Sequence, residues 1–254
     1  MITQYRFALS EDSGRPLPSF WAYRLYAWLL SQIDDDYAEQ LHQSGENPLS
    51  QSVCRDRASG QDLWEVNLLQ DEAAARFAPV LESVGEIPLH GVTLHAAPLS
   101  VTTRTLSQLT GEARAGTPAR RTTLRFATAT AFKSGGRYAI FPQERWLLQT
   151  LITRWGLAFP EMPLDDPDAF LLLESGLHIA DYGLHTTRYP LKNVKIPGFL
   201  GTITVESRLA APMEEVWQLL LRFAPYAGAG IKTTLGMGAL RVEPPRRGLP
   251  TDDA

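Results

Sequence analysis

A glycine-rich stretch near the end of the chain carries the residue types best suited to holding a phosphate. Residues 228–240 read GAGIKTTLGMGAL. Glycine lets a backbone approach a ligand closely, and free N–H groups in such a loop form a concave surface for phosphate oxygens. The residues with this potential are Gly228, Gly230, Lys232, Thr233, Thr234, Gly236 and Gly238. The alternative is a plain turn between a helix and a strand, and these residues alone leave both interpretations open.

Two familiar phosphate-binding loops do not match this stretch. A P-loop has glycine directly before its lysine and lies between a strand and a helix. Here Ile231 precedes Lys232, and the flanking patterns predict a helix before the loop and a strand after it. The dinucleotide-binding fingerprint fails as well, because Thr233 stands where its last glycine is needed and no strand leads into the turn.

Histidines are the candidates for proton transfer, because their pKa lies near neutrality. The five are His42, His90, His95, His178 and His185. His42 ends a short predicted helix just before the polar QSGENP turn, where its side chain would be exposed. By itself it is most simply a solvent-facing histidine. The other four fall on predicted strands or strand ends, and no carboxylate pattern completes a metal site around them.

The pattern of apolar residues predicts the elements that must position these groups. In the first half we expect strands at 2–9, 50–55, 63–69 and 92–101, and helices at 19–32, 37–42 and 71–84. In the second half we expect strands at 122–132, 177–189, 199–209 and 237–243, and helices at 142–155 and 212–223. Residues 111–119 read as an irregular polar run.

Both halves thus follow the order strand, helix, strand, strand, helix, strand, which is the ferredoxin-like unit. We predict an α+β protein with tandem ferredoxin-like (RRM-like) domains, in which antiparallel sheets carry helices on one face. The expected domains are residues 1–119 and 120–243, followed by a flexible tail at 244–254.

The end of the chain also resembles a known family. The pattern G-x-G-x-K-T-x-x-G-x-G, between a helix and a strand, is similar to the C-terminal signature of the CRISPR-associated endoribonucleases that process precursor CRISPR RNA, within the RAMP superfamily. The segments AFKSGGRYAIFPQERWLLQTLITRW (131–155) and KIPGFLGTITVES (195–207) resemble further parts of that family. The resemblance covers residues 120–243 and extends to the first half through the leucine-histidine step at 41–42.

The resemblance implies a chemistry and two catalytic residues. In this family the 2′-OH attacks the adjacent phosphate without a metal, leaving a 2′,3′-cyclic phosphate and a 5′-OH. The family's catalytic histidine matches His42, and Tyr26, followed by Tyr23, is nearest to a tyrosine that some relatives use. A lysine that assists in some relatives is missing, since the matching segment begins with Asn47. The resemblance implies no cofactor and no metal, and repeat RNA rather than DNA as the partner, with other CRISPR effector subunits as further partners.

Charge is distributed in blocks, although the chain as a whole is acidic, with a net charge of −4. Residues 1–103 carry 6 basic and 14 acidic side chains, whereas residues 104–154 carry 9 basic and 2 acidic ones. Localised basic segments favour a track for a polyanion. Beside the glycine-rich loop, the candidate RNA contacts are Arg120, Arg121, Arg125, Lys133, Lys192 and Lys195.

Composition bounds the remaining possibilities. No run approaches the roughly 18 apolar residues of a membrane span, no signal segment is evident, and the single Cys54 cannot form an intramolecular disulfide. A cytoplasmic protein is expected.

We predict an endoribonuclease that cleaves precursor CRISPR RNA. The alternative is a non-catalytic RNA-binding subunit of an effector complex; a third possibility, a small-molecule enzyme, has no supporting motif.

Overall fold

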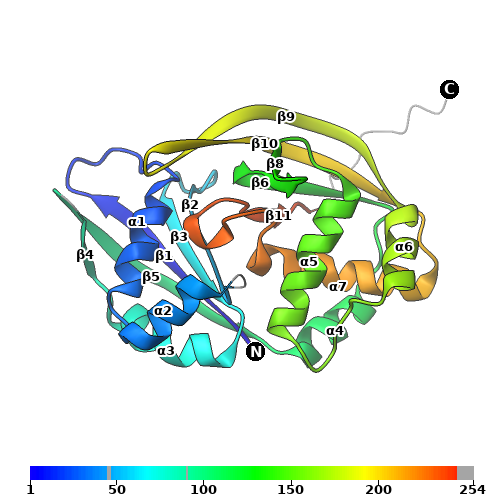
Figure 1. The fold of residues 1–254 in the computed structure, drawn as a ribbon, viewed down its shortest axis with the longest axis horizontal. Coiled ribbons are helices and arrows are strands. Elements are labelled where there is room, and N and C mark those ends of the chain that lie inside the picture. The colour runs from blue at the N-terminus through cyan, green and yellow to red at the C-terminus, as the bar shows by residue number, and fades with distance from the viewer. Residues whose placement is uncertain (45–46, 90, 245–254) are drawn as a thin grey trace.

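The computed structural model describes residues 1–44, 47–89 and 91–244 of the 254-residue chain. It has two antiparallel sheets side by side, each with helices against one face (Figure 1). His90 lies outside the described residues, as does the expected flexible tail apart from Pro244. Among the described helices, none is both long and apolar enough to cross a membrane.

The first sheet has the strand order β2-β3-β1-β5-β4. Its elements are β1 (Ile2–Glu11), α1 (Trp21–Leu30), α2 (Asp35–Gln43), β2 (Leu49–Arg55), β3 (Asp62–Leu68), α3 (Asp71–Ser83), β4 (Glu86–Leu89) and β5 (Val92–Arg104). Tyr5, Phe7 and Leu9 alternate on the buried face of β1, since every second side chain of a strand points the same way. They pack with residues of α1 and α3 such as Leu25 and Phe77, which places the helices on that face.

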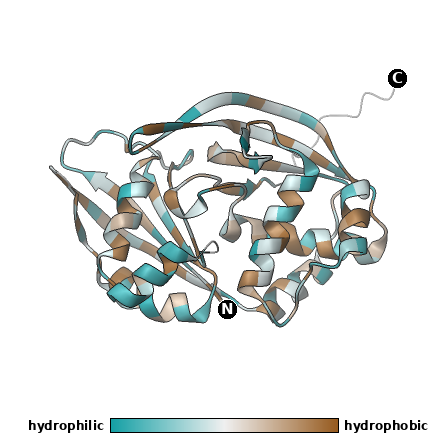
Figure 2. Cartoon of the chain, in the orientation of Figure 1, coloured by the Kyte–Doolittle hydropathy of each residue, from teal (hydrophilic) through white to brown (hydrophobic). Residues whose placement is uncertain are grey.

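The second sheet has the order β11-β6-β10-β9. Its half of the chain contains α4 (Leu106–Ala115), β6 (Arg121–Thr130), β7 (Phe132–Ser134), β8 (Arg137–Ala139), α5 (Glu144–Ala158), α6 (Pro167–Gly176), β9 (Leu177–Leu191), β10 (Val194–Ser207), α7 (Ala211–Ala227), the 3₁₀ turn η1 (Thr233–Leu235) and β11 (Leu240–Val242). Trp155 and Phe223 bury the facing sides of α5 and α7. Figure 2 shows hydrophobic residues on the helix sides that face the sheets, whereas the outer surfaces of α2 and α3 are mostly hydrophilic.

Both sheets confirm the predicted tandem ferredoxin-like fold. The orders β2-β3-β1-β5 and β11-β6-β10-β9 are the same arrangement of the four strands of a β-α-β-β-α-β unit. The short β4 adds an edge strand to the first sheet, and β7 and β8 form a separate two-stranded hairpin.

The expectation of an irregular run at 111–119 was wrong for its first part, which belongs to α4. Thr105 caps this helix, and its side chain and that of Gln108 bond reciprocally to backbone N–H groups. Leu109 and Ala113 pack into the core of the second half. Helix α6, which we did not expect, begins with an Asp166 cap and buries Leu173. Each of these helices buries few residues, so their apolar periodicity is too weak to read from the sequence.

The packing of α4 bears on the domain boundary. Its buried side chains join the core formed around α5 and α7, although the helix precedes residue 120. The boundary between 119 and 120 stays a prediction, and the packing favours a division near Thr105.

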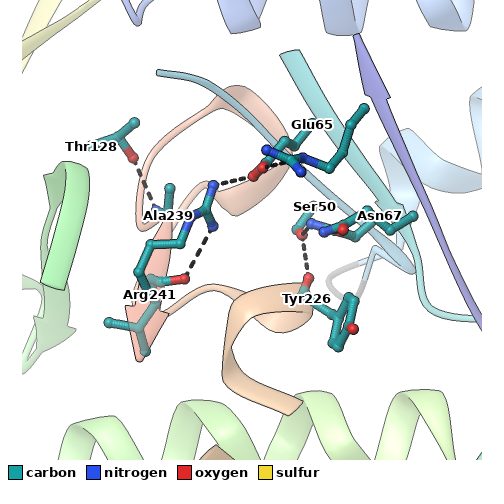
Figure 3. A network of polar contacts seen from close by, with 10 residues as sticks. Ser50, Glu65, Asn67, Thr128, Tyr226, Ala239 and Arg241 are labelled. Carbon is teal, nitrogen blue, oxygen red and sulfur yellow. Dashed lines mark hydrogen bonds and ion pairs between the residues drawn. The ribbon is translucent and has the colours of Figure 1, made fainter. Parts of the chain in front are cut away.

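Polar contacts join the two halves of the chain. Glu65 on β3 pairs with Arg6 on β1 at 3.0 Å. On its other side it pairs with Arg241 on β11 (Figure 3). The Ser50 hydroxyl donates to the Tyr226 carbonyl and accepts from Asn67 at 3.0 Å. These contacts hold the end of the chain, including the glycine-rich loop, against the first domain.

Candidate functional site

The glycine-rich loop lies between the two domains. Gln51 on β2 donates from Nε2 to the carbonyls of Ala22 at 2.9 Å and Thr234 at 2.8 Å, and so ties the loop to α1. The Tyr189 hydroxyl of β9 donates to the Leu235 carbonyl at 2.5 Å. Gly236 has φ +94°, and a Cβ there would collide with the Ala22 side chain and lie 2.7 Å from the Tyr189 hydroxyl. This glycine therefore permits close packing of the loop on α1.

Much of the loop backbone is already hydrogen-bonded within the protein. The N–H groups of Ala229, Ile231 and Gly238 donate to the carbonyls of Gly238, Ala131 and Ala129, respectively. The N–H groups of Leu235 and Met237 both donate to the Lys232 carbonyl. The sequence suggested an open cradle of free N–H groups, but these amides close the loop on itself and hold it against the end of β6. Within the loop, Thr233 is buried, with 4% of its surface exposed.

Lys232 is the exposed cation of this loop. Its φ of 57° and ψ of 37° place it in the left-handed region, which non-glycine residues seldom adopt. It precedes η1, whose carbonyls and amides close a tight turn behind it. The turn therefore projects the lysine side chain from a rigid base toward solvent.

His42 lies in the last turn of α2, where it is exposed as the sequence predicted. Asp34 caps the helix by accepting from the Tyr37 N–H at 2.9 Å and also pairs with Arg76 at 2.9 Å. Tyr37 and Leu41 bury the opposite face of the helix. The imidazole is thus carried by an anchored helix while its own side remains open to a substrate.

Tyr26 lies in the core of the first domain, with only 7% of its surface exposed. Its hydroxyl accepts a hydrogen bond of 2.7 Å from the side-chain amide of Asn47, which lies five positions after His42. Burial raises the pKa of Tyr26, and the bond from Asn47 partly opposes this. The phenol therefore stays protonated near neutral pH and fixes the start of the segment that leads to β2.

Arg154 on α5 is a residue whose importance the sequence did not indicate. Its Nη2 donates to the Leu49 carbonyl at 3.3 Å, which links the second domain to the segment that follows His42. Burial lowers the pKa of Arg154 to about 10. Its buried Nε has no hydrogen-bond partner among the described residues. Its position in the helical apolar pattern gave no signal, because only the folded chain brings Leu49 to α5.

The basic residues predicted to contact RNA lie at separate places in the fold. Arg120 and Arg121 lie at the start of β6, whereas Lys133 follows the opposite end of that strand. The ten residues of β6 separate these two places by roughly 30 Å. Lys192 and Lys195 lie at the turn from β9 to β10, and the Lys192 ammonium is 5.9 Å from the centre of the Tyr23 ring of α1.

Several of these cations already have acidic partners. Glu206 accepts from Arg208, Arg121 and Arg120 at 2.9 to 3.2 Å, and these donors lower its pKa to about 2. Arg120 and Arg121 still expose 74% and 66% of their side chains. Arg125 is less available, since it pairs with Glu243 at 2.5 Å and exposes 24%. The start of β6 therefore keeps an excess of positive charge, whereas Arg125 mainly joins β6 to the end of the chain.

Comparison with known proteins gives the family. The model of the family "CRISPR-associated endoribonuclease Cas6" matches residues 124–240. The chain is 30% identical over 230 residues to Cas6 from Mycobacterium tuberculosis, and the match covers 87% of this chain and 71% of that protein. The chain belongs to the Cas6 family of CRISPR-associated endoribonucleases. It is also 29% identical to Cas6 from Streptococcus thermophilus, over 87% of this chain and 91% of the relative.

Solved Cas6 structures share the whole fold. A Cas6 product complex superposes with a TM-score of 0.75 at 27% identity, over 96% of this chain and 100% of the other. A Cas6 substrate mimic complex gives a TM-score of 0.70 at 25% identity with the same coverage. The Cas6 likeness therefore includes the first domain, where the resemblance read from the sequence rested on little more than the leucine-histidine step.

Proposed function

We propose that this Cas6-family protein cleaves precursor CRISPR RNA within its repeats, in the cytoplasm, by metal-independent transesterification. In that reaction the 2′-OH attacks the adjacent phosphate, the bond to the 5′-oxygen breaks, and the products are a 2′,3′-cyclic phosphate and a 5′-OH. Family membership supports the endoribonuclease activity. Relatives at similar identity over nearly the whole chain have been solved as a product complex and a substrate mimic complex, which supports RNA as the partner.

The observation that carries the mechanism is the setting of His42. It is an exposed imidazole on an anchored helix end, and Asn47 and Leu49, which follow it in the sequence, are bonded to Tyr26 and Arg154. In the proposal His42 accepts the 2′-OH proton or protonates the leaving oxygen. A related Cas6 structure with 26% identity is a variant in which one histidine is replaced by alanine, which also draws attention to a histidine.

We assign RNA contact to Lys232, the exposed cation of the glycine-rich loop, and to the cations at both ends of β6 and on the β9–β10 hairpin. Tyr26 stays a proposed assistant to His42, acting through the position of Asn47, because its own hydroxyl is buried and bonded. Because the lysine is missing and the phenol is buried, His42 lacks the two assisting groups that some relatives use. This favours, as the second candidate, a protein that binds CRISPR RNA without cutting it.

One assay separates these functions. Repeat RNA from the CRISPR array of the source genome is incubated with the protein in excess EDTA, and binding and cleavage are measured in parallel. We expect cleavage with a 2′,3′-cyclic phosphate end. Binding without cleavage would favour the second candidate, and cleavage only after Mg²⁺ is restored would contradict metal independence.

The residue assignment has its own test. His42→Ala should lower the single-turnover cleavage rate about 10²- to 10⁴-fold, the usual cost of losing a proton-transfer group, while RNA affinity changes little. His178→Ala, which removes an exposed histidine from β9, is the matched control and should cut normally. Tyr26→Phe should have the smaller effect. If His42→Ala cuts at the wild-type rate, the assignment of His42 is wrong.

A further inference from the structure

A groove of about 310 Å³ lies beside the glycine-rich loop, between α5 and β7. Helix α5 forms one wall with a single stripe of residues at 146, 149, 150, 153 and 154, which the 3.6-residue period places on the same side. Gly230 and Ile231 of the loop line it as well, and so does β7. The groove is the size of a small-molecule pocket and much too small for a duplex.

An aromatic surface lines the groove. The rings of Trp146 and Phe132 lie 5.9 Å apart with an interplanar angle of 32°. Phe132 is buried, whereas Trp146 is half-buried and contributes to the groove surface. Ile231 adds an apolar side chain from the loop. A partly exposed indole backed by a second ring is a platform on which a nucleobase can stack.

The charge of the groove is positive. Lys133 is exposed and Arg154 is half-buried, and both contribute to its surface. Among the described residues that line it, there is no carboxylate. A hollow of about 1100 Å³ beside α1 differs, because Glu11 and Asp12 line it together with Arg24. Of these two cavities, the groove at α5 is the one suited to an anion.

Arg154, which lines the groove, is a cation without a full set of partners. Its buried Nε has no partner in the described part of the chain, and a buried polar group without a hydrogen bond costs free energy. Desolvation also opposes its charge, and no carboxylate bonds to it among the described residues. A phosphate in the groove would offset the desolvation of this charge, since guanidinium and phosphate form strong charge-assisted bonds.

We propose that this groove binds one unstacked nucleotide of the RNA substrate, with its base against Trp146 and its phosphate between Lys133 and Arg154. The inference rests on the proposed function and adds a specific subsite to it. Gln149 is exposed on the same wall and offers an amide to the edge of the base. Through the bond from Arg154 to Leu49, the bound nucleotide lies next to the segment that follows His42.

The test is a set of repeat RNAs in which each nucleotide in turn is made abasic, bound to wild-type protein and to Trp146→Leu. In wild type, removing one base should weaken binding about 5- to 150-fold, the range that corresponds to base stacking on an aromatic side chain. Trp146→Leu should weaken the intact RNA similarly, and removing that same base should then cost nothing further. Trp28→Leu, which changes a tryptophan in the acidic hollow, should keep the wild-type profile.

Two further variants guard against misfolding as the explanation. Thr153→Trp fills the groove from an exposed position and should reproduce the loss seen with Trp146→Leu. Lys133→Ala should lower the slope of log affinity against log salt by about 0.7 and leave the abasic profile unchanged. The subsite is refuted if RNA is bound and cut but no abasic position depends on Trp146 or on a filled groove. If wild type neither binds nor cuts repeat RNA, the proposed function and the subsite fail together.

Discussion

Lys232 illustrates how a single residue can be held ready for a ligand. Its left-handed backbone conformation costs free energy, because Lys232 is not a glycine. Such a conformation persists only where the surrounding structure imposes it. Here the imposing structure is the turn η1, and the Lys232 carbonyl accepts from two later N–H groups. The ammonium itself has no acidic partner among the residues that the structure describes. The backbone of Lys232 is thus fixed by the fold, whereas its ammonium has no acidic partner among the described residues.

We therefore expect Lys232→Ala to weaken RNA binding without affecting the fold. Loss of one phosphate contact to single-stranded RNA should flatten the plot of log affinity against log salt by about 0.7. Arg57→Ala removes an exposed cation from the turn between β2 and β3 and is the control, for which slope and affinity should stay at wild-type values. Equal slopes for wild type and Lys232→Ala would argue against a phosphate contact at this residue.

At the scale of elements, the glycine-rich loop functions as a packed connector as well as a candidate RNA contact. Its backbone bonds to the edge of β6, its Thr234 carbonyl accepts from β2, and its Leu235 carbonyl accepts from β9. Helix α1 lies so close that Gly236 faces Ala22 without space for a Cβ. The loop therefore helps to fix the position of one domain relative to the other.

Gly236→Ala should destabilise the protein through this close packing. A Cβ at 236 must displace either α1 or the loop, and overpacking of this kind costs about 1 to 3 kcal/mol beyond the strain of the positive φ. Gly135→Ala is the matched control, since Gly135 also has positive φ but nothing lies within 4 Å of an added Cβ. Urea unfolding of both variants should give a larger loss for Gly236→Ala. The packing argument would be wrong if the two losses were the same.

For the whole molecule, the arrangement of the domains depends on polar groups at their junction. Glu65 is 7% exposed and accepts from Arg6 of its own sheet and from Arg241 of the other (Figure 3). Removing one partner of a buried ionic network is costly because the remaining charges are left without compensation. Both arginines reach solvent, with 39% and 25% of their side chains exposed, which moderates the cost.

Glu65→Gln should therefore lower the free energy of unfolding by roughly 1 to 3 kcal/mol, less than for a fully buried pair. Glu174→Gln breaks the Arg145–Glu174 pair at 2.8 Å within the second domain, and this more exposed pair should contribute about 0 to 1 kcal/mol. Chemical denaturation at neutral pH measures both values. Equal losses would mean that the junction does not rely on Glu65.

The sequence by itself determined the local structure and much of the architecture. Alternation in segments such as 2–9 and the helical spacing of 142–155 set which face of each element is apolar, and the same order of elements in both halves predicted two ferredoxin-like domains. The polar sequence after His42 likewise predicted an exposed histidine, because a helix end with one apolar face leaves the other in water. The apolar periodicity of α4 and α6 was too weak to predict these helices, because each buries only a few residues and those pack against parts of the chain that are distant in the sequence.

Only the tertiary structure decided which of these surfaces meet. Gly236 faces Ala22, Arg154 bonds to Leu49 and Arg241 pairs with Glu65, and in each case the partners are more than a hundred positions apart. The number of cations in residues 104–154 follows from the sequence, but their surroundings do not. Arg121 is paired with Glu206, whereas Lys133 is exposed at the groove. Local periodicity encodes backbone conformation and burial. Whether a cation is paired, and whether a position has space only for glycine, depends on neighbours that are distant in the sequence. Only folding of the chain brings those neighbours within a few ångströms.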